Sequence, residues 1–190
     1  MLTKIAQQLT AVVLGDHYDE QERMLCEYGC ELWLYTVIST IGLLIIGAAL
    51  GFPFETILIV TIFYLCQSNG GGYHASTHNK CFITMVVGLF IGLQLQKICT
   101  QHIYIFLCLG SSFILLRFPL YLHANKRHLL PKKTELKKRS HIITSCILLV
   151  SLYLNFVKIQ KVSYSICIAL FLSSISRLYA VTKEKIVNKE

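Results

Sequence analysis

His74 and Cys81 lie seven residues apart in the polar stretch 67–81 (QSNGGGYHASTHNKC), which separates two apolar runs. Histidine and cysteine can act together in catalysis, because the imidazole takes the thiol proton and the thiolate attacks a carbonyl carbon. On one unbroken helix the two side chains would sit about 10 Å apart along the axis. Direct pairing requires a separation of about 3 Å, so it needs a break in the backbone between them.

The same stretch contains residues that can supply this break. Gly70, Gly71 and Gly72 permit backbone conformations that other residues rarely adopt. Residues that favour helix N-caps follow them: Ser76, Thr77 and Asn79. We therefore expect His74 in a loop and Cys81 in the first turn of a helix. Backbone amides and the helix dipole would stabilise a thiolate there and could hold an oxyanion.

Two other interpretations of this stretch stay open on chemistry alone. His74, His78 and Cys81 are spaced i, i+4, i+7 and could converge on a helix face as three ligands of a catalytic zinc ion. No acidic helper or second ligand cluster lies nearby in the sequence, which weakens the metal interpretation. The three glycines could also form a flexible hinge with no catalytic role.

The rest of the chain has the composition of a membrane protein. Of its 190 residues, 54% are hydrophobic and 15% are charged, with a mean hydropathy of +0.58. In soluble domains about a quarter of the residues are charged. Apolar runs near the membrane-spanning length recur along the chain, so we expect an all-α integral membrane protein with a single domain. No secretory signal peptide is expected, since the first 30 residues include several acidic ones.

About six transmembrane or half-membrane helices are expected to position the polar stretch. The second, at about 54–67, is short against the ~20 residues that a span needs, and Gly51 and Pro53 should break the chain before it. The predicted order is amphipathic N-terminal helices (1–33), spans one to four (34–116) with the catalytic loop (67–81), a basic loop (117–140), two further spans (141–181) and a polar tail (182–190).

The net charge of +8 comes mainly from loops beside apolar segments. The positive-inside rule then places both termini, the loop 67–81 and the basic loop 117–140 in the cytoplasm. Nucleic-acid binding is not expected, because no basic surface interleaved with aromatic residues is evident. Arg177 falls inside the last predicted span, where we expect it to extend toward the membrane surface. The eight cysteines do not resemble a disulfide framework.

The stretch GGGYHASTHNKCFI (70–83) resembles the accessory gene regulator protein B (AgrB) family, membrane cysteine endopeptidases of Gram-positive bacteria. The family pattern is Gly-Gly-x-His-Ala with a cysteine seven residues after the histidine, matched here by Gly71, Gly72, His74, Ala75 and Cys81. Residues 27–39 are similar to the family's segment before its first span. Residues 118–140 are similar to its lysine-rich loop, and the length and span order also agree.

This resemblance implies a cysteine endopeptidase in which Cys81 is the nucleophile and His74 is the general base and acid, without metal or cofactor. It implies an AgrD-like propeptide substrate with an internal cysteine and an acidic tail. The tail leaves, an acyl-enzyme forms, and the substrate cysteine then closes a thiolactone ring for quorum sensing. It also implies a multi-pass protein in the cytoplasmic membrane of a Gram-positive bacterium. Independently of the resemblance, the short second and third spans could lead two copies to form a homodimer around a chamber. Lys132 and Lys133 could attract the acidic tail.

Gln67 departs from the family pattern, in which an arginine often stands about seven residues before the histidine. Glutamine could replace only the hydrogen bonds of that arginine, so substrate choice or efficiency could differ. A third catalytic group is not assigned, and the loop candidates are Ser68, Asn69 and Asn79. The alternative function is a small membrane transporter or peptide exporter without proteolytic activity. Transporters often contain internal repeats and intramembrane charges, and no convincing repeat is evident here.

Overall fold

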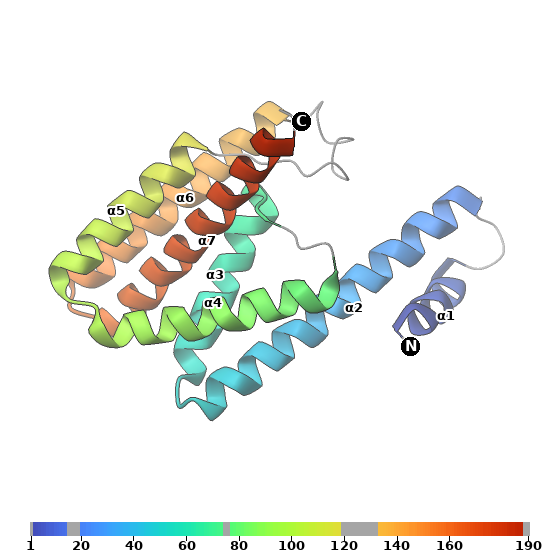
Figure 1. The fold of residues 1–190 in the computed structure, drawn as a ribbon, viewed down its shortest axis with the longest axis horizontal. Helices are drawn as coiled ribbons and strands as arrows, with labels where there is room; N and C mark the ends of the chain where they lie inside the picture. Colours follow the sequence, from blue (N-terminus) through green and yellow to red (C-terminus); the bar gives the residue numbers. More distant parts are fainter. Residues whose placement is uncertain (1, 15–19, 74–76, 119–132, 188–190) are drawn as a thin grey trace.

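The computed structural model describes residues 2–14, 20–73, 77–118 and 133–187, and nearly all of these described residues lie in helices. In chain order the helices are α1 (Leu2–Leu14), α2 (Glu20–Ala49), α3 (Pro53–Gly70), α4 (His78–Ile98), α5 (Gln101–Arg117), α6 (Lys133–Phe156) and α7 (Gln160–Val187) (Figure 1). The described residues contain no strand, which confirms the predicted all-α class.

Four of the described helices, α2, α4, α6 and α7, are long and apolar enough to cross a membrane. The helix α5 is apolar but shorter, and α3 is not among the candidate spans. Large apolar side chains stay exposed on the outer helix faces, including Trp33, Phe106, Phe113 and Tyr153. Contact of such an apolar surface with lipid chains is favourable, whereas its exposure to water would be unfavourable. The protein is therefore a multi-pass membrane protein.

The helix α2 differs from the expectation of an amphipathic helix followed by a separate first span. Glu20–Ala49 is one continuous helix of 30 residues, because no proline interrupts it. At 1.5 Å per residue it is about 45 Å long and exceeds the ~30 Å hydrocarbon core. The helix α1 lies beside its N-terminal half, away from the other helices (Figure 1), and Thr3 donates a hydrogen bond of 3.1 Å to Glu31.

The predicted break before α3 is confirmed. Gly51 has a φ of 82°, and Pro53 is the first residue of α3. Proline suits this position, because an N–H there would have no partner within the helix. The helix α3 has 18 residues and extends through the polar sequence Gln-Ser-Asn-Gly at its end. It is thus longer than the expected segment 54–67 and ends in polar residues.

The helix α6 begins at Lys133, well before the expected start at residue 141. Its first residues, KTELKKR, are mostly good helix formers. Glu135 and Arg139 also form an exposed i, i+4 ion pair of 3.3 Å. The C-terminal part of the predicted basic loop is therefore helical.

The helix α7 is the centre of the bundle and packs against α3, α4, α5 and α6 (Figure 1). Its buried positions are mostly small, including Ser163, Ser165, Ala169, Ser173 and Ser174. Small residues let helices in a membrane approach closely. One core cluster joins α2, α3 and α4 to α7 around Leu43 and Leu89. A second cluster joins α3 and α5 to α7 around Tyr104 and Leu170.

Arg177 is buried within this bundle, with 1% of its surface exposed, so the expectation that it extends to the membrane surface is wrong. Its guanidinium donates hydrogen bonds to the carbonyls of Leu115 (3.3 Å), Phe118 (3.0 Å) and Cys66 (3.2 Å). Leu115 lies in the last turn of α5 and Phe118 directly follows that helix, where carbonyls lack partners within the helix, whereas Cys66 lies one turn before the end of α3. Arg177 therefore ties the C-terminal ends of α3 and α5 to α7.

Candidate active site

The helix α3 ends at the glycine run that the sequence analysis singled out. The N–H of Gly71 donates to the carbonyl of Gln67 at 2.9 Å, and Gly71 has a φ of 68° and a ψ of 179°. This backbone region is almost restricted to glycine. The predicted break between the two apolar segments is therefore present at Gly71.

The helix α4 begins at an N-cap residue, as predicted. The Thr77 hydroxyl accepts the N–H of Lys80 at 3.4 Å, and the N–H of Cys81 donates to the Thr77 carbonyl at 3.0 Å. Cys81 therefore lies in the first turn of α4 and is half-buried. At this end of a helix the amide groups and the helix dipole favour negative charge.

His74 lies outside the described residues, together with Ala75 and Ser76, but the residue before it is well anchored. The N–H of Tyr73 lies 3.2 Å from the carbonyl and 3.1 Å from the hydroxyl of Ser176 in α7. The Tyr73 ring also meets the Tyr179 ring edge-on, with 4.7 Å between centroids. Contacts with α7 therefore hold the chain in place at Tyr73, the residue before His74.

Gln67, predicted as a substrate contact, is held by α7. Its side-chain amide donates a hydrogen bond of 2.7 Å to the Ser176 hydroxyl. Gly72 packs so closely on this amide that a Cβ at position 72 would overlap it. Gln67 therefore connects α3, the glycine run and α7, and it also forms part of the wall of a cavity.

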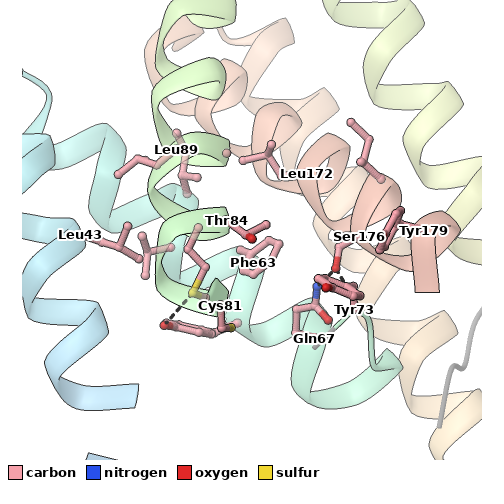
Figure 2. Close-up of a pocket in the computed structure, with 16 residues that line it drawn as sticks. Leu43, Phe63, Gln67, Tyr73, Cys81, Thr84, Leu89, Leu172, Ser176 and Tyr179 are labelled. Atoms are coloured by element: carbon pink, nitrogen blue, oxygen red, sulfur yellow. Dashed lines mark hydrogen bonds between the residues drawn. The ribbon is translucent and has the colours of Figure 1, made fainter. Parts of the chain in front are cut away.

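This cavity has a volume of about 480 Å³ and lies between α3, α4 and α7, with one contribution from α2. Figure 2 shows Cys81 at the start of α4, with Gln67, Tyr73 and Ser176 grouped on the α7 side. The structure thus brings Cys81, Gln67 and the residue before His74 to one cavity. The lining residues are Leu43, Ile59, Val60, Phe63, Tyr64, Gln67, Tyr73, Cys81, Thr84, Met85, Gly88, Leu89, Leu172, Ile175, Ser176 and Tyr179.

His78, which the metal interpretation requires, lies against an aromatic side chain. Its ring stacks on that of Tyr35 in α2, with centroids 3.8 Å apart and planes 7° from parallel. In the described part of the chain, no group of three His, Cys, Asp or Glu side chains could hold a metal ion. His74 is outside that part, so the three-ligand arrangement itself is not tested.

The remaining candidates are placed only in part. Lys132 lies outside the described residues, and Lys133 is the first residue of α6, with a side chain that is not described. The side chains of Ser68 and Asn69 both donate to the Leu65 carbonyl, at 3.1 and 2.8 Å. These two side chains are therefore bonded within α3.

Ser176 and Arg177 are site residues that the sequence analysis did not identify as partners of the polar stretch. Both are in α7, and Ser176 meets Gln67 across a sequence separation of 109 residues. A serine next to an arginine in an apolar segment gives no indication of its partner. The sequence shows that Arg177 lies in an apolar segment, but it does not show which helix ends Arg177 joins.

The fold and the site define an all-helical membrane protein with a cysteine at a helix N-terminus beside a glycine break. The chain belongs to the Accessory gene regulator B family, which matches residues 2–177. It is 24% identical over 149 residues to a provisionally named AgrB-like protein 2 of Clostridium perfringens (strain 13 / Type A). It is 23% identical over 149 residues to an AgrB-like protein, also provisionally named, of Clostridium perfringens (strain SM101 / Type A).

Each of these two alignments covers 73% of this chain and 68% of the relative. No solved structure matches the chain. The predicted family is therefore confirmed, and with it a role in accessory gene regulator processing of quorum-sensing peptides at the membrane.

Proposed function

We propose that this protein is a membrane cysteine endopeptidase that removes the C-terminal tail of an AgrD-like propeptide. Cys81 is the nucleophile, and His74 is the general base and then the general acid. The observation that carries the proposal is the position of Cys81, in the first turn of α4 and in the wall of the cavity that Tyr73 also lines. Tyr73 directly precedes His74, and consecutive Cα atoms are about 3.8 Å apart.

In the first half of the reaction, His74 takes the proton of the Cys81 thiol, and the thiolate attacks the carbonyl carbon of the scissile peptide bond. A tetrahedral oxyanion forms, which the amide groups at the start of α4 can stabilise. The C–N bond then breaks as His74 gives its proton to the leaving amine. The tail departs, and a thioester remains between Cys81 and the rest of the propeptide.

In the second half, the internal cysteine of the propeptide attacks this thioester. One thioester replaces another, so the step needs positioning of the thiol more than an energetic drive. His74 passes the proton of the substrate thiol to the Cys81 sulfur as this sulfur leaves, so the products are a cyclic thiolactone and the Cys81 thiol. Water attacking the same thioester would instead give a linear acid.

The glycines act in this proposal through the backbone. Gly71 turns the chain out of α3 in a conformation that residues with a side chain avoid, and Gly72 leaves room for the Gln67 amide. Together they set the direction in which the chain leaves α3 before His74. No metal or cofactor takes part in the proposed steps.

The setting that we propose is the cytoplasmic membrane of a Gram-positive bacterium. Both termini and the loop 67–81 face the cytoplasm, where the propeptide is made. Lys132 and Lys133 attract the acidic tail from the same side. Two copies of the chain could associate within the membrane.

Co-expression with a candidate AgrD-like propeptide tests the peptidase function. We expect the wild type to remove the tail, as read from the product mass, and Cys81→Ser and His74→Ala to leave the propeptide whole. Cys99→Ser is a matched control, because Cys99 follows the other end of α4 and is also half-buried. Removal of the tail by Cys81→Ser would contradict the proposal and leave transport or metal chemistry as alternatives.

A further inference from the structure

The Tyr64 side chain reaches from α3 toward the start of α4. Its hydroxyl donates a hydrogen bond of 3.9 Å to the Met85 sulfur and accepts one of 3.4 Å from the Thr40 hydroxyl of α2. Met85 follows Cys81 by four residues, so the two lie on one face of α4, and helix side chains lean toward the N-terminus. The Met85 sulfur therefore lies on the side of Cys81. The Tyr64 hydroxyl is beside the proposed nucleophile, close enough for an electrostatic interaction with Cys81.

The two contacts of this hydroxyl leave its proton available to a stronger acceptor. Hydrogen bonds between hydroxyl groups are usually about 2.7–2.8 Å long, and a thioether sulfur is a weak acceptor. Two other donors in the wall of the cavity have short bonds elsewhere. The Thr84 hydroxyl donates to the Lys80 carbonyl at 2.8 Å, and the Gln67 amide donates to Ser176 at 2.7 Å. Tyr64 can thus turn its O–H toward a charged acceptor and lose only a weak bond.

The proposed reaction creates an acceptor of this kind. When the thiolate adds to the peptide carbonyl, the carbonyl oxygen becomes negatively charged and is stabilised by donors that point at it. The backbone at the start of α4 supplies only part of these donors. The N–H of Cys81 donates to the Thr77 carbonyl at 3.0 Å, and the N–H of Lys80 donates to the Thr77 hydroxyl at 3.4 Å. The N–H group of the nucleophile itself is therefore engaged, and a side-chain donor beside Cys81 would complete the site.

We propose that Tyr64 is the third catalytic group and that its hydroxyl donates a hydrogen bond to the oxyanion. This inference rests on the proposed role of Cys81 as nucleophile. The hydroxyl keeps its proton throughout: the O–H···O⁻ bond forms as the tetrahedral intermediate forms, and it weakens when the C–N bond breaks and the carbonyl returns. The same bond forms again when the substrate thiol attacks the thioester. Because the bond strengthens as negative charge develops, it lowers the barrier more than it strengthens substrate binding.

The first part of the test is Tyr64→Phe, which removes one oxygen atom and keeps the ring. We expect kcat for removal of the tail from a candidate AgrD-like propeptide to fall about 100-fold, the usual effect of losing one oxyanion donor. KM should change little, because the lost interaction is made in the transition state. Tyr104→Phe is the matched control. The Tyr104 hydroxyl lies 2.9 Å from that of Ser151, outside the cavity, and its loss should leave kcat within about two-fold.

The second part is alkylation of Cys81 by iodoacetamide in the full-length protein, followed by the mass of the peptide that contains Cys81. The thiolate forms a carbon–sulfur bond and iodide leaves, so no oxyanion arises. We expect the rate and its pH profile to be the same in Tyr64→Phe and the wild type. Equal cleavage by Tyr64→Phe and the wild type would overturn the inference and leave the peptidase intact. A parallel loss of alkylation would also overturn it, because the hydroxyl would then act on the thiolate or on the fold. Absence of cleavage by the wild type would overturn the proposed function and this inference with it.

Discussion

Ser176 joins two parts of the polar stretch to α7 through one hydroxyl group. The Gln67 amide donates to this hydroxyl at 2.7 Å, and the backbone N–H of Tyr73 donates to it at 3.1 Å. The end of α3 and the residue before His74 are thus fixed to the same point. Cys81 lines the same cavity as these three residues, so we propose that the Ser176 hydroxyl positions Tyr73, the residue before His74, relative to the proposed nucleophile.

Replacement of this hydroxyl should slow propeptide cleavage. We expect Ser176→Ala to lower the initial rate about five-fold, since a hydrogen bond contributes about 1 kcal/mol. The rate is measured in membranes that contain equal amounts of protein. Ser174→Ala is the control, because the Ser174 hydroxyl is bonded to the Phe171 carbonyl in its own helix. Equal rates for the two variants would show that the contact with Ser176 does not position the loop.

The conformation of Gly71 predicts a cost for any side chain at that position. Gly71→Ala should reduce stability by about 1–3 kcal/mol, because φ and ψ there are nearly restricted to glycine. We expect a lower midpoint of thermal unfolding in detergent and slower cleavage. Gly110→Ala, within α5, should keep or raise the midpoint, because alanine favours helices. An unchanged midpoint for Gly71→Ala would mean that the break at α3 has another conformation.

Arg177 should stabilise the fold and not only the site. Its guanidinium serves carbonyls at the ends of α3 and α5, and Arg177→Met would leave them buried without this donor. We expect the free energy of unfolding, measured by titration with denaturing detergent, to fall by about 1–3 kcal/mol. The free energy of unfolding of Arg177→Lys should lie between those of the wild type and Arg177→Met, because a lysine cannot donate to several carbonyls in one plane. The exposed Arg117 is the control, and equal losses for Arg117→Met would contradict this role.

Lys132 and Lys133, of which Lys133 is the first residue of α6, are proposed to attract the acidic tail of the propeptide. Lys132→Gln combined with Lys133→Gln should slow processing, and the effect should be larger at low ionic strength, where charges act over about 30 Å instead of about 8 Å. The matched control replaces Lys158, between α6 and α7, and Lys161, in the first turn of α7, with Gln. The readout is the cleavage rate at two salt concentrations, with membrane insertion checked by the amount of protein. A salt-independent effect, or equal effects of the two pairs, would reject the attraction.

Local features of this structure could be predicted from the sequence because each is determined within a few residues. Thr77 can cap a helix because of its hydroxyl, and Gly71 can break one because it has no side chain. The position of Cys81 in the first turn of α4 follows from these two. Gly51 and Pro53 end one helix and begin the next for the same reasons.

Features that depend on distant partners could not be predicted. Arg177 was expected at the membrane surface because a charge is costly in lipid. The sequence does not reveal that the ends of α3 and α5 supply carbonyl acceptors around it. The contact of Gln67 with Ser176 likewise depends on how α3 and α7 pack. The sequence analysis placed a helix boundary where polar residues change to apolar ones. In α2 and α6 the residues on both sides of this change favour a helix, so each helix continues through it.

The most direct measurement of the central claim is the mass of the enzyme during turnover. The substrate is an AgrD-like propeptide in which alanine replaces the internal cysteine, so that ring closure cannot remove the acyl group. After an acid quench, we expect wild-type protein to gain the mass of the propeptide without its tail, attached at Cys81 and released by hydroxylamine. Cys99→Ser should carry the same adduct. If the tail is removed and the adduct is absent, or lies on another residue, Cys81 is not the nucleophile.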